Sequence, residues 1–177
     1  DALGGEMGKA ADATALQFKM LNTTKGPGVQ SLRVQSDKLA YARYMQEVLL
    51  RQEHLEVKEM MIEQVICDKG KVCGVKLADG LVERSKIVIM TTGTFMTSKV
   101  MVGHDFVYSG PDQEPTTVNL SQSLRDAGLK TFRLKTGTPA RVLTSSIDFS
   151  KTEVQPGTDA FLCFSHETTN IRPFKEQ

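Results

Sequence analysis

Residues 86–95 read Lys-Ile-Val-Ile-Met-Thr-Thr-Gly-Thr-Phe, an unbroken apolar run that stops at a Thr-Gly turn. A run without alternation that ends in a turn signal predicts a strand buried on both faces of a sheet. Ligands of open α/β sheets bind just beyond the carboxyl ends of such strands. Gly93 has no Cβ, so a ligand can approach the backbone closely there. The alternative is a core strand that ends in an ordinary glycine turn.

Composition sets the broad class of the protein. The chain has 177 residues, 40% hydrophobic and 24% charged, with a net charge of +1. These values are typical of about one soluble globular domain, without the overall basic charge of many nucleic-acid-binding proteins. We find no apolar run of the roughly 20 residues that span a bilayer and no signal peptide. Three cysteines without a paired CxxC spacing favour free thiols in a reducing compartment.

The first half of the chain predicts a strand, a loop and a helix. Residues 16–21 alternate apolar and polar side chains, as a half-buried strand does. Residues 22–28 contain two glycines and a proline, which predicts a loop. Ser36 or Asp37 can cap a helix that runs to about Gln52. Its apolar stripe is predicted to face the core and comprises Leu39, Ala42, Met45, Val48 and Leu49.

An antiparallel meander is predicted between this helix and the stretch at 86–95. A short strand at 55–60 comes first, and three β-branched runs follow at 62–67, 72–77 and 81–84, separated by Lys-Gly and Asp-Gly turns. A parallel sheet with such a meander in a crossover is an arrangement that flavoproteins use. We therefore predict an α/β fold class, a partial dinucleotide (FAD)-binding fold with an antiparallel β-meander. The Gly-x-Gly-x-x-Gly turn that would hold a pyrophosphate is absent from the sequence.

The second half is predicted to be a β-rich insertion with one short helix. A long loop at 96–115 leads to a helix at 118–127 that ends at Gly128. A strand at 131–134 follows. The basic residues Arg133, Lys135 and Arg141 surround a Thr-Gly-Thr turn, which suits an anion, although a solvated basic loop explains them equally. We expect short strands or packed loop at 147–149 and 161–164. The predicted domains are thus 1–95 and 96–177.

Six stretches, in order and with compatible spacing, resemble the GidA/MnmG family, the FAD-dependent tRNA uridine 5-carboxymethylaminomethyl modification enzymes. They are residues 1–5, 16–22, 25–27, 91–95, 133–139 and 146–150. The chain looks like an internal piece of that larger protein. Cys67, Cys73 and Cys163 match neither of the family's catalytic cysteines, so no catalytic residue is assigned. The sequence departs from the family at Gln30, usually arginine, and at 109–115, which lacks the family's Gly-Arg-x-Gly.

The resemblance implies specific site residues. Ile62 matches a position beside the adenine of FAD. Thr92 and Gly93 match the turn against its pyrophosphate and ribose, and Thr117 matches another FAD contact. The loop Lys25, Gly26 and Pro27 would lie near the flavin ring. Arg133 and Lys135 would contact tRNA phosphates, a role that both residue types suit.

The resemblance also implies a function for the intact protein. It would modify the wobble uridine of tRNA with FAD, a reduced nicotinamide (NAD) and a folate donor. It would act as a homodimer with a GTPase partner that binds an absent carboxy-terminal domain. We expect a cytoplasmic location, or mitochondrial in a eukaryote, and an isolated chain without activity. The alternatives are part of another flavin oxidoreductase and a non-catalytic module that binds RNA or protein.

Overall fold

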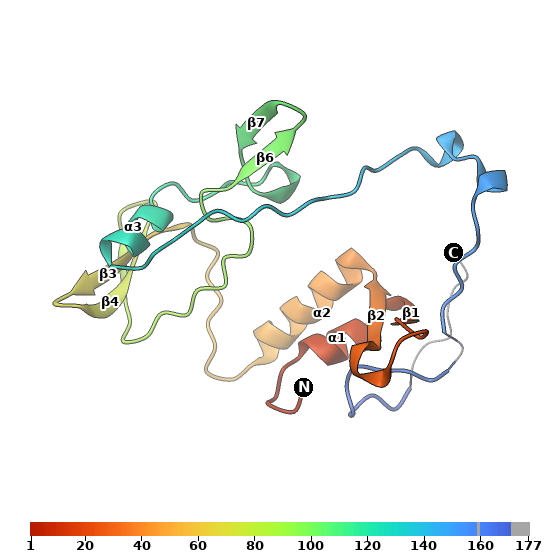
Figure 1. Ribbon diagram of the computed structural model, residues 1–177. Helices are drawn as coiled ribbons and strands as arrows, with labels where there is room; N and C mark the ends of the chain where they lie inside the picture. The colour runs from red at the N-terminus through yellow and green to blue at the C-terminus, as the bar shows by residue number, and fades with distance from the viewer. Residues whose placement is uncertain (159, 171–177) are drawn as a thin grey trace. The chain divides into compact units, whose positions relative to one another are not determined.

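A computed structural model describes residues 1–158 and 160–170 (Figure 1). The chain forms two compact units. Unit 1 comprises Asp1–Val57 and the described part of Ala140–Gln177, and unit 2 is Lys58–Pro139. The limits of these compact units differ from the predicted domain boundary near residue 95. The division into domains at 1–95 and 96–177 stays a prediction.

Unit 1 is built on a two-stranded sheet and two helices. Its elements are α1 (Met7–Ala13), β1 (Ala15–Leu21), η1 (Pro27–Val29), β2 (Ser31–Ser36), α2 (Lys38–Arg51), η3 (Thr144–Ser146) and η4 (Phe149–Lys151). The strand predicted at 16–21 is confirmed as β1, which pairs antiparallel with β2. Phe18 is 1% exposed and lies opposite Val34 in the sheet. Together with the buried Ala10 and Ala11 of α1, it forms the small core of this unit.

The predicted cap of helix α2 is confirmed. The prediction that its apolar stripe faces the core is confirmed only in part. The carboxylate of Asp37 accepts hydrogen bonds from the N–H groups of Leu39 and Ala40, both at 2.9 Å. These bonds satisfy two donors that the first helical turn leaves free. No residue of α2 is buried, however, and Leu39 is 66% exposed. The apolar stripe of α2 therefore finds few partners within the described residues.

Unit 2 contains the predicted meander. Its elements are β3 (Ile62–Asp68), β4 (Lys71–Leu77), β5 (Val82–Arg84), β6 (Lys99–Val102), β7 (Asp105–Tyr108), η2 (Pro111–Gln113) and α3 (Leu120–Asp126). The strands β3, β4 and β5 form one antiparallel sheet in that order, as predicted from the Lys-Gly and Asp-Gly turns. The buried Leu77, Leu120 and Leu124 form the core where α3 packs on β3. The predicted end of this helix at Gly128 is confirmed by a φ of +91°.

Gly74 holds two strands of the meander close together. It has a φ of +148°, and a Cβ placed on it would lie 2.1 Å from the carbonyl oxygen of Glu83 on β5. Any side chain at this position would separate the strands or shift the backbone. The glycine thus explains how β5 pairs tightly with β4.

The buried strand predicted at 87–91 is wrong for this chain. Residues 87–92 belong to no helix or strand, and Ile87 and Ile89 are 75% and 83% exposed. A strand buried on both faces needs neighbouring strands and covering layers. The sheets of the described residues are all antiparallel and do not include this segment. Most of its apolar side chains therefore remain exposed, and Val88 is half-buried.

Other local predictions also need correction. The strands at 55–60 and 131–134 do not form, because no neighbouring strand pairs with these segments in the described part of the chain. At 147–149 and 161–164, where short strands or packed loop were expected, the structure has no strand. The loop at 96–115 contains the hairpin β6–β7, which turns at Gly103 and His104. Helix α1 and strand β2 were not predicted. Between residues 96 and 170, strands occur only in this hairpin among the residues described, so the region is less rich in strands than predicted.

None of the described helices is both long enough and apolar enough to cross a membrane.

Candidate functional site

Three predicted cofactor-binding residues come together in unit 2 through the backbone of Phe95. The Phe95 N–H donates to the carbonyl of Thr92 at 3.1 Å, which closes the turn around Gly93. The Phe95 carbonyl accepts from the Thr117 N–H at 3.1 Å and from the Thr116 hydroxyl at 2.6 Å. The Thr-Gly turn and Thr117, far apart in sequence, are therefore parts of one structure.

Gly93 supplies an open backbone position at this turn. Its φ is +53°, and an added Cβ would meet only the ring of Phe95 at 3.9 Å. A positive φ explains the preference for glycine, since other L residues are strained in this conformation. The open space beside the backbone is the property that a close ligand contact requires.

Thr117 contributes to the site mainly by fixing the loop. It is 7% exposed, and its hydroxyl accepts a hydrogen bond from the N–H of Thr97 at 3.2 Å. A parallel bridge pairs it with Met96. Its side chain and N–H thus already have partners inside the protein, so it holds the Thr-Gly turn in position.

Glu63 connects Ile62 to the same structure, and the sequence analysis missed it. Ile62 is the half-buried first residue of β3, opposite the buried Leu77. The next side chain, Glu63, accepts from the N–H of Val118 at 3.1 Å and of Asn119 at 2.7 Å. A lone acidic residue in a strand gives no sequence signal for such a contact. Glu63 therefore joins the start of β3 to the loop that carries Thr117.

The predicted loop of Lys25, Gly26 and Pro27 belongs to unit 1. It is exposed and leads into η1. The Lys25 carbonyl accepts from the Gln30 side chain at 3.1 Å, and the Lys25 N–H donates to the Asn22 carbonyl at 2.9 Å. The side chain of Gln30 thus stabilises the loop.

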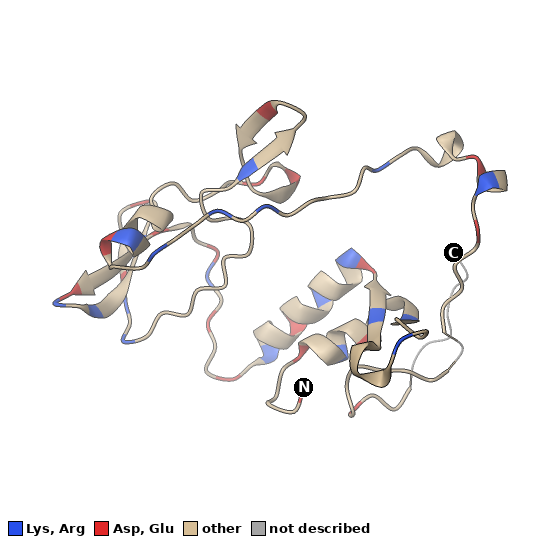
Figure 2. Cartoon of the chain, in the orientation of Figure 1, with Lys and Arg blue, Asp and Glu red and all other residues tan. Residues whose placement is uncertain are grey.

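Arg133 and Lys135 lie on an exposed segment of unit 2 that has neither helix nor strand. Within the described part of the chain, neither side chain has a carboxylate partner within ion-pair distance. Their charges are therefore available to an anionic partner. Figure 2 shows further basic positions along the same segment.

The three cysteines form no disulfide with one another. Cys67 is exposed, and Cys73 and Cys163 are half-buried, all as free thiols. No group of three or more His, Cys, Asp or Glu side chains among residues 1–158 and 160–170 could hold a metal ion.

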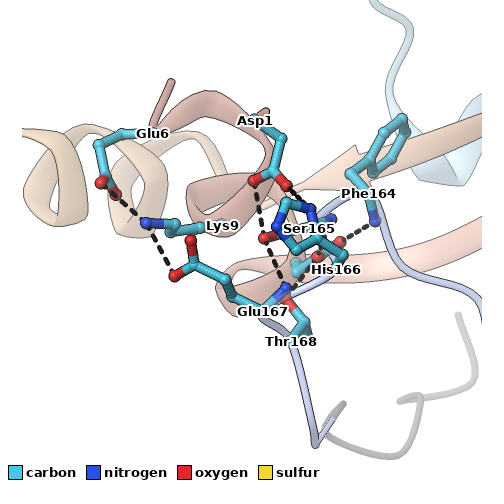
Figure 3. Close-up of polar contacts among 9 residues, drawn as sticks. Asp1, Glu6, Lys9, Phe164, Ser165, His166, Glu167 and Thr168 are labelled. Carbon is cyan, nitrogen blue, oxygen red and sulfur yellow. Dashed lines mark hydrogen bonds and ion pairs between the residues drawn. The ribbon is translucent and has the colours of Figure 1, made fainter. Parts of the chain in front are cut away.

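A buried polar cluster in unit 1, shown in Figure 3, was also missed by the sequence analysis. Asp12 on α1 is 6% exposed and accepts hydrogen bonds from the Phe164 N–H, the Ser165 N–H and the Thr168 hydroxyl, at 2.7 to 2.9 Å. The Ser165 hydroxyl donates to Asp1 at 2.8 Å. These contacts attach the segment at 164–168 to α1. The polar groups of the cluster are hydrogen-bonded to other groups of the protein, which points to a structural role.

Lys9 closes the edge of this cluster. Its ammonium lies 3.0 Å from Glu167 and 3.2 Å from Glu6. Hydrogen bonds to Glu167, and secondly to Glu6, raise the pKa of Lys9. The lysine is therefore charged throughout the physiological pH range and gives the segment a second attachment to α1.

Comparison with known proteins identifies the family. A mixed α/β fold with a meander and a Thr-Gly turn is shared with many proteins, but the family model of glucose inhibited division protein A matches residues 1–177. This chain belongs to the glucose inhibited division protein A (GidA) family.

Relatives agree with this assignment over the whole chain. The tRNA uridine 5-carboxymethylaminomethyl modification enzyme MnmG of Mycoplasma capricolum is 48% identical over 100% of this chain and 28% of its own length. The enzyme of the same name from Mycoplasma mycoides is 49% identical with the same coverage. A crystal structure of GidA from Aquifex aeolicus matches with a TM-score of 0.88 and 43% identity, over 100% of this chain and 30% of that one. The chain thus spans less than a third of these proteins.

Proposed function

We propose that this chain supplies part of the FAD site of an enzyme that adds a carboxymethylaminomethyl group to C5 of the wobble uridine of tRNA. The observation that carries the proposal is the connection of Thr92, Gly93 and Thr117 through Phe95. It occurs in a chain about half identical to enzymes named for this modification.

The residues of unit 2 suit one part of a dinucleotide. Gly93 leaves its backbone open to a ligand, and Ile62 offers an apolar side chain at the start of β3. The carboxylate of Glu63 has lone pairs beyond its two N–H contacts and can accept from ribose hydroxyls. FAD, when bound, would carry out the two-electron redox chemistry. The residues of this chain would bind and orient it.

The described residues do not provide a complete dinucleotide site. A pyrophosphate is usually held by backbone N–H groups at a glycine-rich turn before a helix. The sequence contains no Gly-x-Gly-x-x-Gly turn. The chain alone is therefore expected to bind FAD weakly and to lack activity. A reduced nicotinamide, a folate donor, a GTPase partner, a homodimer and a cytoplasmic location belong to the same proposal for the whole protein.

A chimera tests the proposal. In it, this chain replaces the matched segment of the Mycoplasma capricolum enzyme, and the purified protein is assayed for flavin absorbance between about 350 and 500 nm and for uridine modification. We expect bound flavin and modified tRNA from the chimera, and neither from the isolated chain. A folded chimera with flavin but without tRNA activity would favour another flavin oxidoreductase. A folded chimera that binds tRNA but no flavin would favour a non-catalytic RNA-binding module.

A further inference from the structure

The hairpin β6–β7 carries an exposed aromatic face. Its register places Lys99 opposite Tyr108 and Met101 opposite Phe106, so these four side chains share one side of the hairpin. We call this side the aromatic face. All eight strand residues are exposed, with Phe106 at 55% and Tyr108 at 59%. Large side chains are thus presented to solvent on a regular and well-defined backbone.

The two rings and the lysine form one arranged group. The ring centroids of Phe106 and Tyr108 are 5.7 Å apart, and the ring planes meet at 89°. The Lys99 ammonium lies 4.6 Å from the centroid of Phe106 and 5.3 Å from that of Tyr108. Cation–π attraction accounts for this position. The rings therefore hold a positive charge directly beside their exposed surfaces.

This charge has no acidic partner in the described part of the chain. Lys99 takes part in no ion pair there. The acidic residue of the hairpin, Asp105, pairs with Val102 and so lies on the other face. Figure 2 shows the blue position of β6 and the red position of β7 at opposite ends of the hairpin. The aromatic face is therefore cationic as well as apolar.

We propose that the aromatic face binds unpaired nucleobases of single-stranded RNA. Phe106 and Tyr108 would stack on successive bases, while Lys99 would turn from the rings to the adjoining phosphate. Base stacking on aromatic side chains combined with backbone neutralisation is the general mode of single-strand recognition. The inference deepens the proposed function, since it assigns loop nucleotides of the tRNA substrate to a surface that no predicted site residue occupies.

Charge complementarity favours RNA over a second copy of the hairpin. Two copies packed through this face would bring two Lys99 charges together in a desolvated interface, which is unfavourable. A single-stranded RNA offers both π surfaces and negative charge to the same group. Duplex RNA keeps its bases stacked inside the helix, so only its phosphates could contact this face, through Lys99.

Tryptophan fluorescence can test this directly, because the chain contains no tryptophan. Phe106→Trp places a probe on the aromatic face, and Val107→Trp places the matched control on the opposite face at a position that is also exposed, at 65%. Each variant of the chain is titrated with a short single-stranded RNA and with a duplex of the same sequence. We expect quenching only for Phe106→Trp with the single strand. Equal quenching of both variants, quenching by the duplex, or no quenching would overturn the proposal.

Affinity measurements separate stacking from charge. Phe106→Ala and Tyr108→Ala should each weaken binding of the single strand about fivefold or more, whereas Val107→Ala should leave it within about twofold. Lys99→Ala should reduce the slope of log K against log salt by about 0.7. If the chain without RNA forms a dimer, and Phe106→Ala abolishes that dimer, the aromatic face binds a second copy of the chain instead of RNA. If the chimera has normal flavin content and modifies tRNA, but the hairpin substitutions do not change RNA binding, the RNA-binding role of the aromatic face is refuted and the proposed function is not.

Discussion

The carboxylate of Asp12 accepts a hydrogen bond from the backbone N–H of Ser165 at 2.9 Å, across 153 positions of the sequence. Asp12 is 6% exposed and Ser165 is fully buried. The same carboxylate accepts from the Phe164 N–H and the Thr168 hydroxyl (Figure 3). One side chain of α1 thus fixes the path of a segment that has neither helix nor strand.

Asp12→Ala should destabilise unit 1 strongly. The change removes three hydrogen bonds and leaves the buried N–H of Ser165 and the part-buried N–H of Phe164 without their partner, a loss of about 3 kcal/mol in the free energy of unfolding. Urea unfolding measures the change. The control is Asp148→Ala, which removes an exposed cap of η4 and should have a much smaller effect. Equal effects of the two substitutions would contradict a structural role of the Asp12 cluster.

Gly93→Val should abolish flavin binding in the chimera. The branched side chain would fill the open space beside the turn and would be strained at a φ of +53°. Gly93→Asn separates the two effects, because asparagine tolerates a positive φ but still fills the space. Flavin absorbance of the purified variants is the measurement. Gly80→Val, at an open hairpin turn, is the control for strain alone. Undiminished flavin in Gly93→Val would remove the turn from the site.

Replacing both Arg133 and Lys135 with alanine should weaken tRNA binding by the chimera and lower its salt slope by about 1–2 units. Both residues are exposed and have no carboxylate partner among the described residues. Filter binding at several salt concentrations gives the slope. The matched control replaces Lys69 and Lys76, which are exposed on the meander of the same unit. If both double variants change the slope equally, the effect reflects overall charge and not this segment.

Gln113→Gly should stabilise unit 2, whereas Glu114→Gly should destabilise it. Gln113 has a φ of +66°, which costs about 1–2 kcal/mol for a side chain with a Cβ. Glycine removes this strain at an entropic cost of about 0.5–1 kcal/mol. Glu114 has a φ of −70°, so its replacement brings only the entropic cost. Thermal unfolding should place the two variants on opposite sides of the parent chain, and the same sign for both would show that Gln113 is not strained.

Ser150→Ala should raise the pKa of Asp148. Hydrogen bonds from Ser150, and secondly from Lys151, hold the pKa of Asp148 below its ordinary value. A lowered pKa in the folded state means that the contribution of Asp148 to stability is present above its ordinary pKa of about 3.8, and is lost as the pH falls through the lower pKa of the folded state. Carboxyl NMR titration reports the change. Lys151→Ala should produce a smaller rise, and the reverse order would contradict the stated cause.

Local sequence determined the elements that need only near neighbours. Asp37 caps α2 through the N–H groups two and three residues ahead. The Lys-Gly and Asp-Gly turns set the order of β3, β4 and β5. Such contacts depend on short-range geometry and side-chain chemistry, which the sequence states directly. Gly93 was also predicted as a turn, and its φ of +53° confirms that conformation.

Long-range partners were decided only by the tertiary structure. The apolar run at 87–90 predicts a buried strand, yet a strand forms only where another strand pairs with it, and no described segment does so. The contacts of Asp12 with Ser165 and of Glu63 with Asn119 join residues that no periodicity relates. Thr117 reaches the Thr-Gly turn through a single backbone carbonyl of Phe95. Hydrophobic pattern and turn chemistry act over a few residues, whereas these hydrogen bonds exist only after the chain has folded back on itself.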